Sequence, residues 1–397
     1  MKTVLFLGCV LGFLVPGVKP FAAQERRPPA ITGNRVIFAM VNDDGTVSMW
    51  GIARETGFGD GRSSKTAFHE KPTPVAGITT AVQVAVNEQH VLVLLADGSV
   101  VGWGANNECQ VGNGDPAKKM LRNDRLPPVY SPVPVTGLRN VKAVAAGDAF
   151  SVALLNDGTL MTWGRPNLGR LGFGPIGSEL DIDILPCVPV PTPVPGVSRV
   201  KAIAAYSSHT LALLKDGTVI AFGRNKEGQL GDGTRKPRET PVKVLGVANA
   251  VAVAAGDESS VALLADGAVW TWGSKSNGRS GDGEEEGSKP TPGPVAGLPG
   301  AKAIATGVGI VMVQLKDGTL RGWGEGYYGA LGNNSAGDVF FKPQTPIGLG
   351  PVVAYSLAGG AAFAWKADGT LMAWGQAMMQ PDGKLGYSKV PVRLWAK

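Results

Sequence analysis

The chain is poor in cysteine, in histidine and in long apolar runs, and each shortage excludes a class of protein. Only three cysteines and three histidines occur in 397 residues. The histidines are not accompanied by any repeated carboxylate or cysteine spacing, so no zinc site is predicted. Beyond the first residues no apolar segment approaches the length that spans a bilayer. We therefore expect no metal site and no integral membrane segment in the mature chain.

Signals of catalysis and of nucleic-acid binding are also missing. There is neither a Gly-x-Ser-x-Gly elbow nor a phosphate-binding Walker loop. The formal charge is +6, but the basic residues are scattered and form no stripe interleaved with aromatics. Acidic groups such as Asp181 with Asp183, or Glu284 to Glu286, fall in loops, where solvated charge is the more common role. The sequence predicts a protein that is not an enzyme, binds no cofactor and binds no nucleic acid.

The N-terminus resembles an export signal. Lys2 precedes an apolar run from Val4 to Val15, and small residues at Ala22-Ala23 come just before a charged stretch. A charged n-region, an apolar central region and a cleavage site of small residues are typical of a secretory signal peptide. We expect residues 1–23 to be the signal and 24–32 a short linker, with a retained N-terminal anchor as the alternative. The predicted location is the cell envelope, the periplasm or the exterior.

Glycine and proline, at 57 and 29 residues, are abundant, and they mark one internal repeat. An Asp-Gly pair, four residues and then an aromatic residue with Gly recur seven times, 50 to 60 residues apart. The seven Asp-Gly pairs begin at Asp44, Asp97, Asp157, Asp216, Asp266, Asp317 and Asp368. The seven aromatic residues are Trp50, Trp103, Trp163, Phe222, Trp272, Trp323 and Trp374. Asp-Gly between two alternating apolar runs is a strong signal for a β-hairpin.

Two further segments complete each repeat. A strand rich in Ala and Gly precedes the hairpin, as in Val141 to Gly147, and small side chains suit a strand crowded near a ring axis. A proline-marked segment such as Thr291 to Val295 follows it, and proline is confined to sheet edges. Four strands in a unit of this length predict one blade of a β-propeller. The fold class is therefore all-β, with seven four-stranded blades in a single domain over residues 33–397.

The two ends of the chain bear on how the ring closes. The first hairpin starts directly from Arg35 to Val41 without a proline segment ahead of it, and the chain ends on the proline segment Lys389 to Leu394. We expect the two termini to share one blade, which would close the ring and leave no open sheet edge. An open solenoid is the alternative, but it would need capping repeats. The closed ring is expected to be a monomer.

The stretch from Asn225 to Gly233, with Ala-Ala-Gly and Val-Ala-Leu-Leu before the next Asp-Gly, resembles the regulator of chromosome condensation repeat family. The resemblance covers about residues 33–397 and implies a seven-bladed propeller whose termini share a blade. The eukaryotic founder is a guanine-nucleotide exchange factor that also binds chromatin. A secreted bacterial relative instead clamps a protein with one face of the ring. The expected export matches the second role better than the first.

Most conspicuous side chains have a structural interpretation. His90 and His209 occupy one repeat position that other copies fill with Phe150 or Ser259, so we expect them to be structural and His69 to lie in a solvated loop. The repeated tryptophans are expected in the core between blades, not on a sugar-binding surface.

The second and third repeats carry the longest loops. From the turn glycine to the proline segment they take 22 and 21 residues, against 10 to 14 in the fourth to sixth repeats. The first loop is basic and the second is acidic, through Glu179, Asp181 and Asp183. Cys109 and Cys187 lie in these loops, and an exported chain permits a disulfide between them. Partner binding by these loops is one hypothesis, and decoration without function is the other.

The sequence thus favours an exported, non-enzymatic propeller that binds a protein or a cell-surface polymer. An inhibitor of a secreted enzyme such as a β-lactamase is a narrower alternative, and exchange-factor activity at the central channel is a third. The candidate partner-binding residues are Lys118, Lys119, Met120, Arg122, Arg125, Tyr130, Tyr327 and Tyr328.

Overall fold

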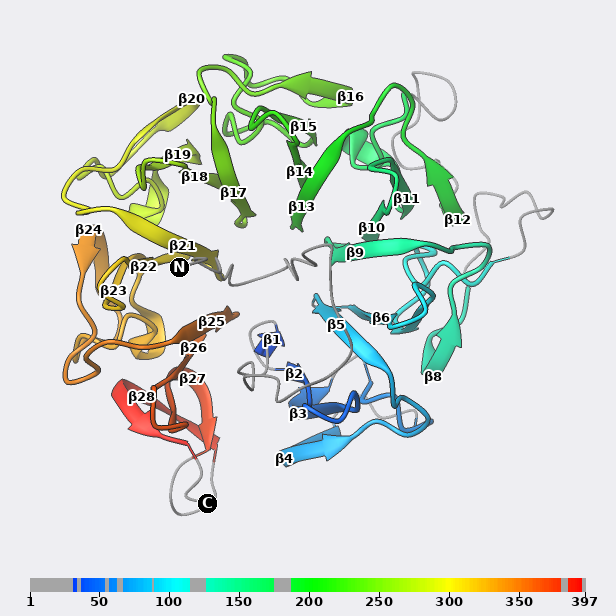
Figure 1. Ribbon diagram of the computed structural model, residues 1–397, viewed down its shortest axis with the longest axis horizontal. Coiled ribbons are helices and arrows are strands. Elements are labelled where there is room, and N and C mark those ends of the chain that lie inside the picture. Colours follow the sequence, from blue (N-terminus) through cyan, green and yellow to red (C-terminus); the bar gives the residue numbers. More distant parts are fainter. Residues whose placement is uncertain are drawn as a thin grey trace, which may run out of the picture.

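The repeat folds into a ring of seven four-stranded antiparallel sheets (Figure 1). The computed structural model describes residues 31–33, 37–53, 57–62, 67–87, 89–114, 126–174, 187–379 and 385–394. The expected signal peptide, residues 1–23, lies outside these ranges. The predicted all-β propeller with seven blades is confirmed, because every described strand belongs to one of the seven sheets.

The first strand of each blade lines the centre of the ring, and the second and third strands follow outward (Figure 1). The innermost strands are β1 (Ile31–Gly33), β5 (Ala81–Val86), β9 (Val141–Ala146), β13 (Val200–Tyr206), β17 (Ala250–Ala255), β21 (Ala301–Thr306) and β25 (Ala354–Ala358). The second strands are β2 (Ile37–Val41), β6 (His90–Leu95), β10 (Phe150–Leu155), β14 (His209–Leu214), β18 (Ser259–Leu264), β22 (Ile310–Leu315) and β26 (Ala361–Trp365). The third strands are β3 (Val47–Ala53), β7 (Val100–Gly104), β11 (Leu160–Gly164), β15 (Val219–Gly223), β19 (Val269–Ser274), β23 (Leu320–Glu325) and β27 (Leu371–Met379).

The proline-marked segments form the outer edge of each blade, as expected from the missing N–H of proline. They are β4 (Ala67–Pro74), β8 (Val129–Pro134), β12 (Val188–Pro193), β16 (Arg238–Lys243), β20 (Ser288–Pro294), β24 (Val339–Gln344) and β28 (Leu385–Arg393). Three short 3-10 turns follow third strands: η1 (Asn167–Gly169), η2 (Ser276–Gly278) and η3 (Tyr327–Gly329).

The expectation of a blade shared between the termini is wrong. Each sheet consists of four strands that are consecutive in sequence, including β1 to β4 and β25 to β28. The innermost strand of blade 1 is β1, only three residues long, which pairs Ile31 with Met40 and begins two residues ahead of the expected domain start. Blade 1 therefore already has its four strands, and no strand from the C-terminus is needed to complete it.

Side-chain packing between blade 1 and blade 7 closes the ring instead. Ile31, Phe38 and Trp50 of blade 1 are buried against Phe363 and neighbouring residues of blade 7. The ring centroids of Phe38 and Phe363 lie 5.6 Å apart in an edge-to-face arrangement, and those of Trp50 and Phe363 lie 6.2 Å apart. Such aromatic pairs stabilise by about 1 kcal/mol beyond the burial of their area.

All seven hydrophobic clusters of the described chain lie between neighbouring blades, one at each junction of the ring. The repeated aromatic residue belongs to this packing, and the predicted core role of the tryptophans is confirmed. Four indole N–H groups reach across to carbonyl oxygens of the preceding blade. They are Trp163 to Gln110 at 3.0 Å, Trp272 to Gln229 at 2.8 Å, Trp323 to Arg279 at 3.2 Å and Trp374 to Ala330 at 3.0 Å.

Candidate functional site

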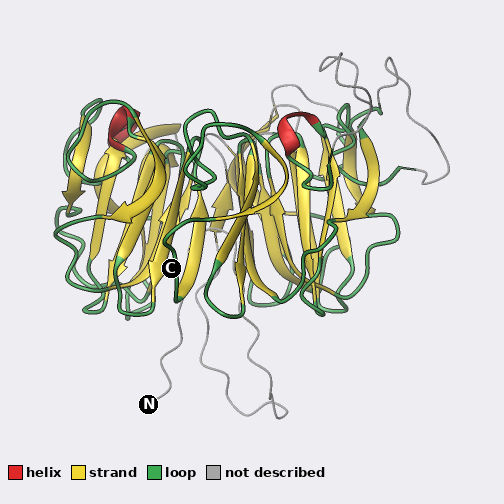
Figure 2. Cartoon of the chain, turned by 90° about the horizontal axis from the view of Figure 1, so that it is seen from above, coloured by secondary structure: helices red, strands yellow, loops and turns green. Residues whose placement is uncertain are grey.

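The propeller has two chemically different faces, and the strand order decides which residues reach each. Turns between first and second strands, and the longer loops between third and outer strands, emerge on one side, which we call the loop face. The Asp-Gly turns and the connections between blades emerge on the other, which we call the hairpin face. Figure 2 shows the 3-10 turns, which follow third strands, along one edge of the ring. Of the candidate binding residues that the structure describes, Tyr327 and Tyr328 in η3 belong to the loop face.

Arginine side chains tie neighbouring blades together on the loop face. Arg279, which is only 8% exposed, lies 3.1 Å from Glu325 of blade 6 and 3.7 Å from both Asp257 and Glu258 of blade 5. Arg224 of blade 4 reaches the same Glu258 at 3.4 Å. These ion pairs cross two blade boundaries and form a network that connects the loops of blades 4 to 6.

Arg170 has the same role between blades 3 and 4. Its guanidinium donates to the carbonyl oxygen of Asp148 at 3.1 Å and to the hydroxyl of Ser208 at 2.9 Å. Burial lowers the pKa of Arg170 to about 10, which still leaves the side chain charged at neutral pH. Arg170 and Arg279 occupy one repeat position, which blades 2 and 4 fill with Gln110 and Gln229.

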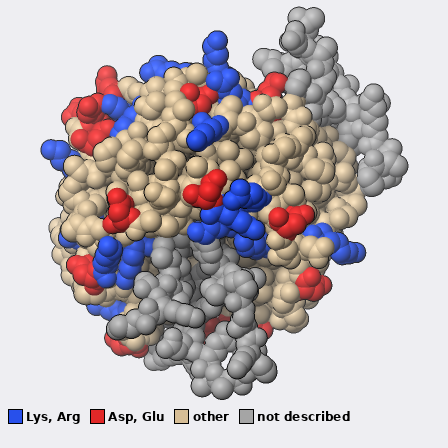
Figure 3. All heavy atoms as spheres, turned by 45° about the horizontal axis from the view of Figure 1, so that its top comes forward, with Lys and Arg blue, Asp and Glu red and all other residues tan. Residues whose placement is uncertain are grey.

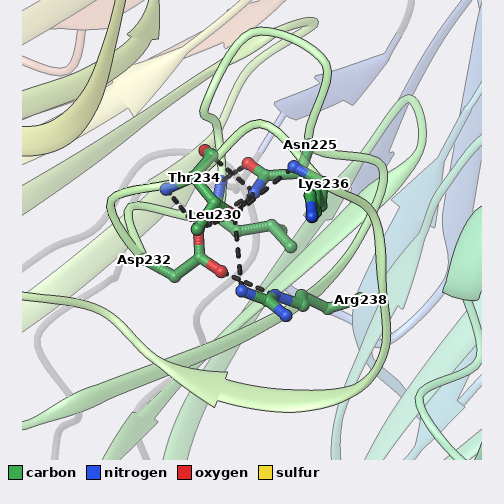
Figure 4. Close-up of polar contacts among 6 residues, drawn as sticks. All are labelled: Asn225, Leu230, Asp232, Thr234, Lys236 and Arg238. Carbon is green, nitrogen blue, oxygen red and sulfur yellow. Dashed lines mark hydrogen bonds and ion pairs between the residues drawn. The ribbon is translucent and has the colours of Figure 1, made fainter.

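A buried asparagine shapes the loop that follows the third strand. In blade 4, Asn225 accepts a hydrogen bond from the amide of Leu230 at 2.9 Å and donates to Asp232 at 3.0 Å (Figure 4). Arg238 on the outer strand donates to the other oxygen of Asp232 at 2.6 Å. Burial acts to raise the pKa of Asp232, but the hydrogen bonds from Thr234 and Arg238 outweigh it and keep that pKa below its ordinary value. The loop is therefore a rigid platform and not a loose connection.

A disulfide joins the second and third blades, as hypothesised from the sequence. Cys109 and Cys187 are bonded, with their Cα atoms 5.7 Å apart. Cys109 has a φ of 61°, at a position that blade 3 gives to Gly169. A Cβ atom on Gly169 would lie 2.2 Å from the carbonyl oxygen of Arg238 on the next blade, so a side chain is excluded there. In blade 2 that close contact is replaced by a covalent bond to Cys187, directly before the outer strand β12.

Tyrosines form the largest exposed aromatic group of the described loop face. Tyr327 and Tyr328 in η3 are 48% and 50% exposed, and Tyr387 on the neighbouring β28 is 48% exposed. The rings of Tyr328 and Tyr387 meet edge to face with centroids 6.0 Å apart. Sequence reasoning found the first two and missed Tyr387. The loop after each third strand contacts the outer strand of the next blade, as η3 contacts β28. This repeated neighbourhood could have pointed to Tyr387.

The remaining candidates divide into two groups. Lys118, Lys119, Met120, Arg122 and Arg125 lie outside the described residues, as do the acidic residues of the third repeat's loop. Tyr130 lies on β8 and is half-buried, and its carbonyl oxygen accepts a hydrogen bond from the amide of Gly61 in blade 1 at 2.9 Å. Its backbone therefore helps to join blades 1 and 2.

The histidines at the repeated position are completely buried. His90 lies 2.8 Å from the hydroxyl of Ser151, which donates its proton to the carbonyl of Gln110 at 2.8 Å. Because that hydroxyl has one proton, the Nε2 atom of His90 must be the donor in their contact. His209, Ser260 and Gln229 repeat the arrangement two blades further on. Burial lowers the pKa of both histidines to about 3, so they are neutral structural groups, as expected.

His69 is not in a solvated loop, contrary to the expectation. It lies on β4, paired with Gly51, and its ring stacks on Phe58 with centroids 3.8 Å apart. Among the described residues, no three His, Cys, Asp or Glu side chains gather in a way that could hold a metal ion. The helices that the structure describes include none with the length and apolarity to cross a membrane.

Comparison with known proteins agrees with this architecture. The model of the RCC1-like domain family matches residues 24–359. Protein pim1 of Schizosaccharomyces pombe is 31% identical over 207 residues, which are 52% of this chain and 36% of pim1. The ultraviolet-B receptor UVR8 of Arabidopsis thaliana is 29% identical over 203 residues, which are 51% of this chain and 42% of the receptor. The matched region thus spans less than half the length of either relative.

Similarity to solved structures extends over most of the ring. The structure of Prp20p from Saccharomyces cerevisiae superposes with a TM-score of 0.73 at 21% sequence identity. The superposition covers 90% of this chain and 87% of Prp20p. At this identity the likeness shows the fold alone.

Proposed function

Because the chain belongs to the RCC1-like domain family, we propose that it is a non-enzymatic scaffold that binds a protein partner through its loop face. Prp20p, with the same fold, is described by its binding to Gsp1p and histones. The fold supports protein binding in general, while the partner has to be inferred from this chain's own surface.

The observation that carries the proposal is the tyrosine patch, defined as Tyr327, Tyr328 and Tyr387. Tyrosine is enriched where proteins bind one another, because it buries a large ring while its hydroxyl keeps a hydrogen bond. The patch lies on a rigid part of the ring, since the amide of Asn334 in the same loop donates to the carbonyl of Lys389 on β28 at 2.9 Å. Binding here requires little ordering of the loop, which favours affinity.

A strained backbone supports the same assignment. Tyr328 has φ 55° and ψ 20°, a left-handed conformation that a bulky residue rarely adopts. In η2 of blade 5 the equivalent residue is Asn277, which tolerates this conformation well. Leu168 in η1 has the same conformation, so the strain belongs to the turn, and it is its combination with an exposed aromatic ring that points to recognition at Tyr328.

We further propose that the protein works in an oxidising compartment outside the cytoplasm. The disulfide between Cys109 and Cys187 supports this, because disulfides persist in such compartments. The N-terminal pattern of residues 1–23 is the second supporting observation. A secreted enzyme as the partner would narrow the function to inhibition.

The test is capture of the partner by immobilised protein from the envelope and secreted fractions of the source organism. The patch variant is Tyr327→Ser with Tyr328→Asn, and the matched control is Leu168→Asn, the position equivalent to Tyr328 in η1. Proteins that bind the native chain and the control, but bind the patch variant at least about tenfold more weakly, support the proposal. Equal capture by the patch variant would refute it.

A further inference from the structure

The hairpin face carries a cluster of positive charge that the proposed function does not use. Over most of the surface drawn in Figure 3, acidic and basic side chains are mixed. Lys142 on β9, Lys201 on β13 and Lys215 after β14 belong to blades 3 and 4 on the hairpin side of the ring. The ammonium group of Lys142 donates to the carbonyl oxygen of Lys201 at 3.3 Å. The first two lysines therefore approach each other across the blade boundary.

The ammonium group of Lys142 lies close enough to Lys201 and Lys215 to be repelled by their charges. Burial lowers the pKa of Lys142, and the charges of Lys215 and Lys201 lower it further. Like charges held together in this way destabilise the free protein, and a bound anion relieves the repulsion.

A pocket lies beside this cluster. It has a volume of about 480 Å³ and opens to solvent on the hairpin face of blade 4. Its lining includes the apolar residues Pro195, Val197, Leu214, Ile220 and Pro241, together with one cation, Arg199, and one carboxylate, Asp216. Arg199 stands two residues before Lys201, and Lys215 directly follows Leu214, so lining residues and lysines lie together at the start of β13 and at the end of β14. The pocket therefore has apolar walls with one arginine and one aspartate, and Lys215, between Leu214 and Asp216 in the sequence, connects it to the lysine cluster.

Blade 6 provides an internal comparison. Lys302 and Lys316 occupy the repeat positions of Lys201 and Lys215. The blade before it, however, has Val251 where blade 3 has Lys142. Blade 6 therefore has the lysine pair without the third ammonium group, which makes it a matched control within the same chain.

We propose that the lysine cluster and the adjoining pocket bind an acidic polypeptide segment that inserts one apolar side chain into the pocket. The four cations Lys142, Lys201, Lys215 and Arg199 outnumber the carboxylate of Asp216 and select acidic residues. The proline, valine, leucine and isoleucine side chains suit an apolar one. None of the lining residues is aromatic, whereas single-stranded nucleic acids are usually held by base stacking on aromatic rings. This site is on the face opposite the tyrosine patch, so it goes beyond the proposed function and does not depend on it.

The test uses a fluorescent synthetic peptide of glutamates around a central leucine, titrated with the protein and followed by anisotropy at low and moderate salt. The native protein is expected to bind and to lose affinity as salt increases. Lys201→Glu with Lys215→Glu should weaken binding by about tenfold or more, while Lys302→Glu with Lys316→Glu should change it by less than about twofold. Replacing the leucine by serine in the peptide, or filling the pocket by Thr240→Trp, should also weaken binding several-fold.

Three results would overturn the proposal. One is no binding of the peptide by native protein at low salt. Another is an equal loss of affinity in the two double variants, which would show an effect of net charge alone. The third is tighter binding of a single-stranded oligonucleotide of the same charge, which would assign the surface to nucleic acid. If a lysine variant fails to fold, the leucine-to-serine peptide and the Thr240→Trp variant still test the proposal, because both should bind more weakly than the native pair.

Discussion

Cys109 of blade 2 is bonded to Cys187 of blade 3 at the point where blades 3 to 6 approach the next blade through a glycine. The bond encloses a sequence separation of 78 residues, for which the loss of entropy in the unfolded chain corresponds to about 4 kcal/mol. The disulfide is thus the only covalent link between blades in the described chain apart from the backbone itself.

The first prediction concerns this bond. Cys109→Ser with Cys187→Ser should lower the free energy of unfolding by up to about 4 kcal/mol, measured by urea or thermal unfolding. Cys109→Gly with Cys187→Ser should be more stable than the double serine variant by about 1 kcal/mol, because glycine adopts the φ of 61° without strain. Two reactive thiols in unfolded, unreduced native protein would contradict the account.

The second prediction is a pH dependence of stability from His90 and His209. Burial holds their pKa at about 3, below the ordinary 6.5, so the unfolded chain binds more protons between these values. The contribution of the two histidines to the free energy of unfolding is therefore fully present above pH 6.5 and is lost as the pH decreases toward 3. Each unit of pKa difference corresponds to about 1.4 kcal/mol, so the loss amounts to several kcal/mol.

The variant His90→Phe with His209→Phe, which introduces the side chain that Phe150 has at the same repeat position, should show a flatter profile across this range. Unfolding free energies at a series of pH values provide the measurement. Parallel profiles of the native and variant proteins would show that the histidines are not the cause.

The third prediction compares two glycines of the repeated hairpin. Gly217 and Gly369 have φ of 82° and 81°. A Cβ atom on Gly217 would lie 2.8 Å from the Cα of Asn249 in the next blade, but one on Gly369 would meet nothing within 4 Å. Gly369→Ala should cost about 1 kcal/mol from strain alone, and Gly217→Ala at least about 1 kcal/mol more. Equal losses in urea unfolding would mean that the hairpin makes no close contact with the next blade.

The fourth prediction separates strain from recognition in the 3-10 turns. Leu168→Asn should raise the free energy of unfolding by about 1 kcal/mol, because Leu168 has a left-handed φ of 60°. Tyr328→Asn should raise the free energy of unfolding by less, because this variant also loses the edge-to-face contact with Tyr387. Thermal unfolding of both variants measures the difference. A larger gain for Tyr328→Asn would show that the aromatic contact contributes no stability.

The sequence predicts the blades because the repeat is local: each Asp-Gly turn and each repeated Trp or Phe lies within one hairpin. Prediction from the sequence failed where the structure depends on contacts between segments that are distant in the chain. β1 has three residues without the Ala-rich pattern of other inner strands, so the sequence shows no inner strand for the first blade and predicts a shared one. The stacking of His69 on Phe58 and the meeting of Tyr387 with Tyr328 depend in the same way on how an outer strand is placed beside a loop.

The central claim is that the loop face, at the tyrosine patch, binds a protein. A photo-reactive phenylalanine analogue placed at Tyr327 tests it most directly, with the same analogue at Ile347, an exposed residue of the connection between blades 6 and 7, as the control. The account predicts one discrete crosslinked protein from native extracts at Tyr327 and none at Ile347. Crosslinking at Ile347 with none at Tyr327 would contradict it.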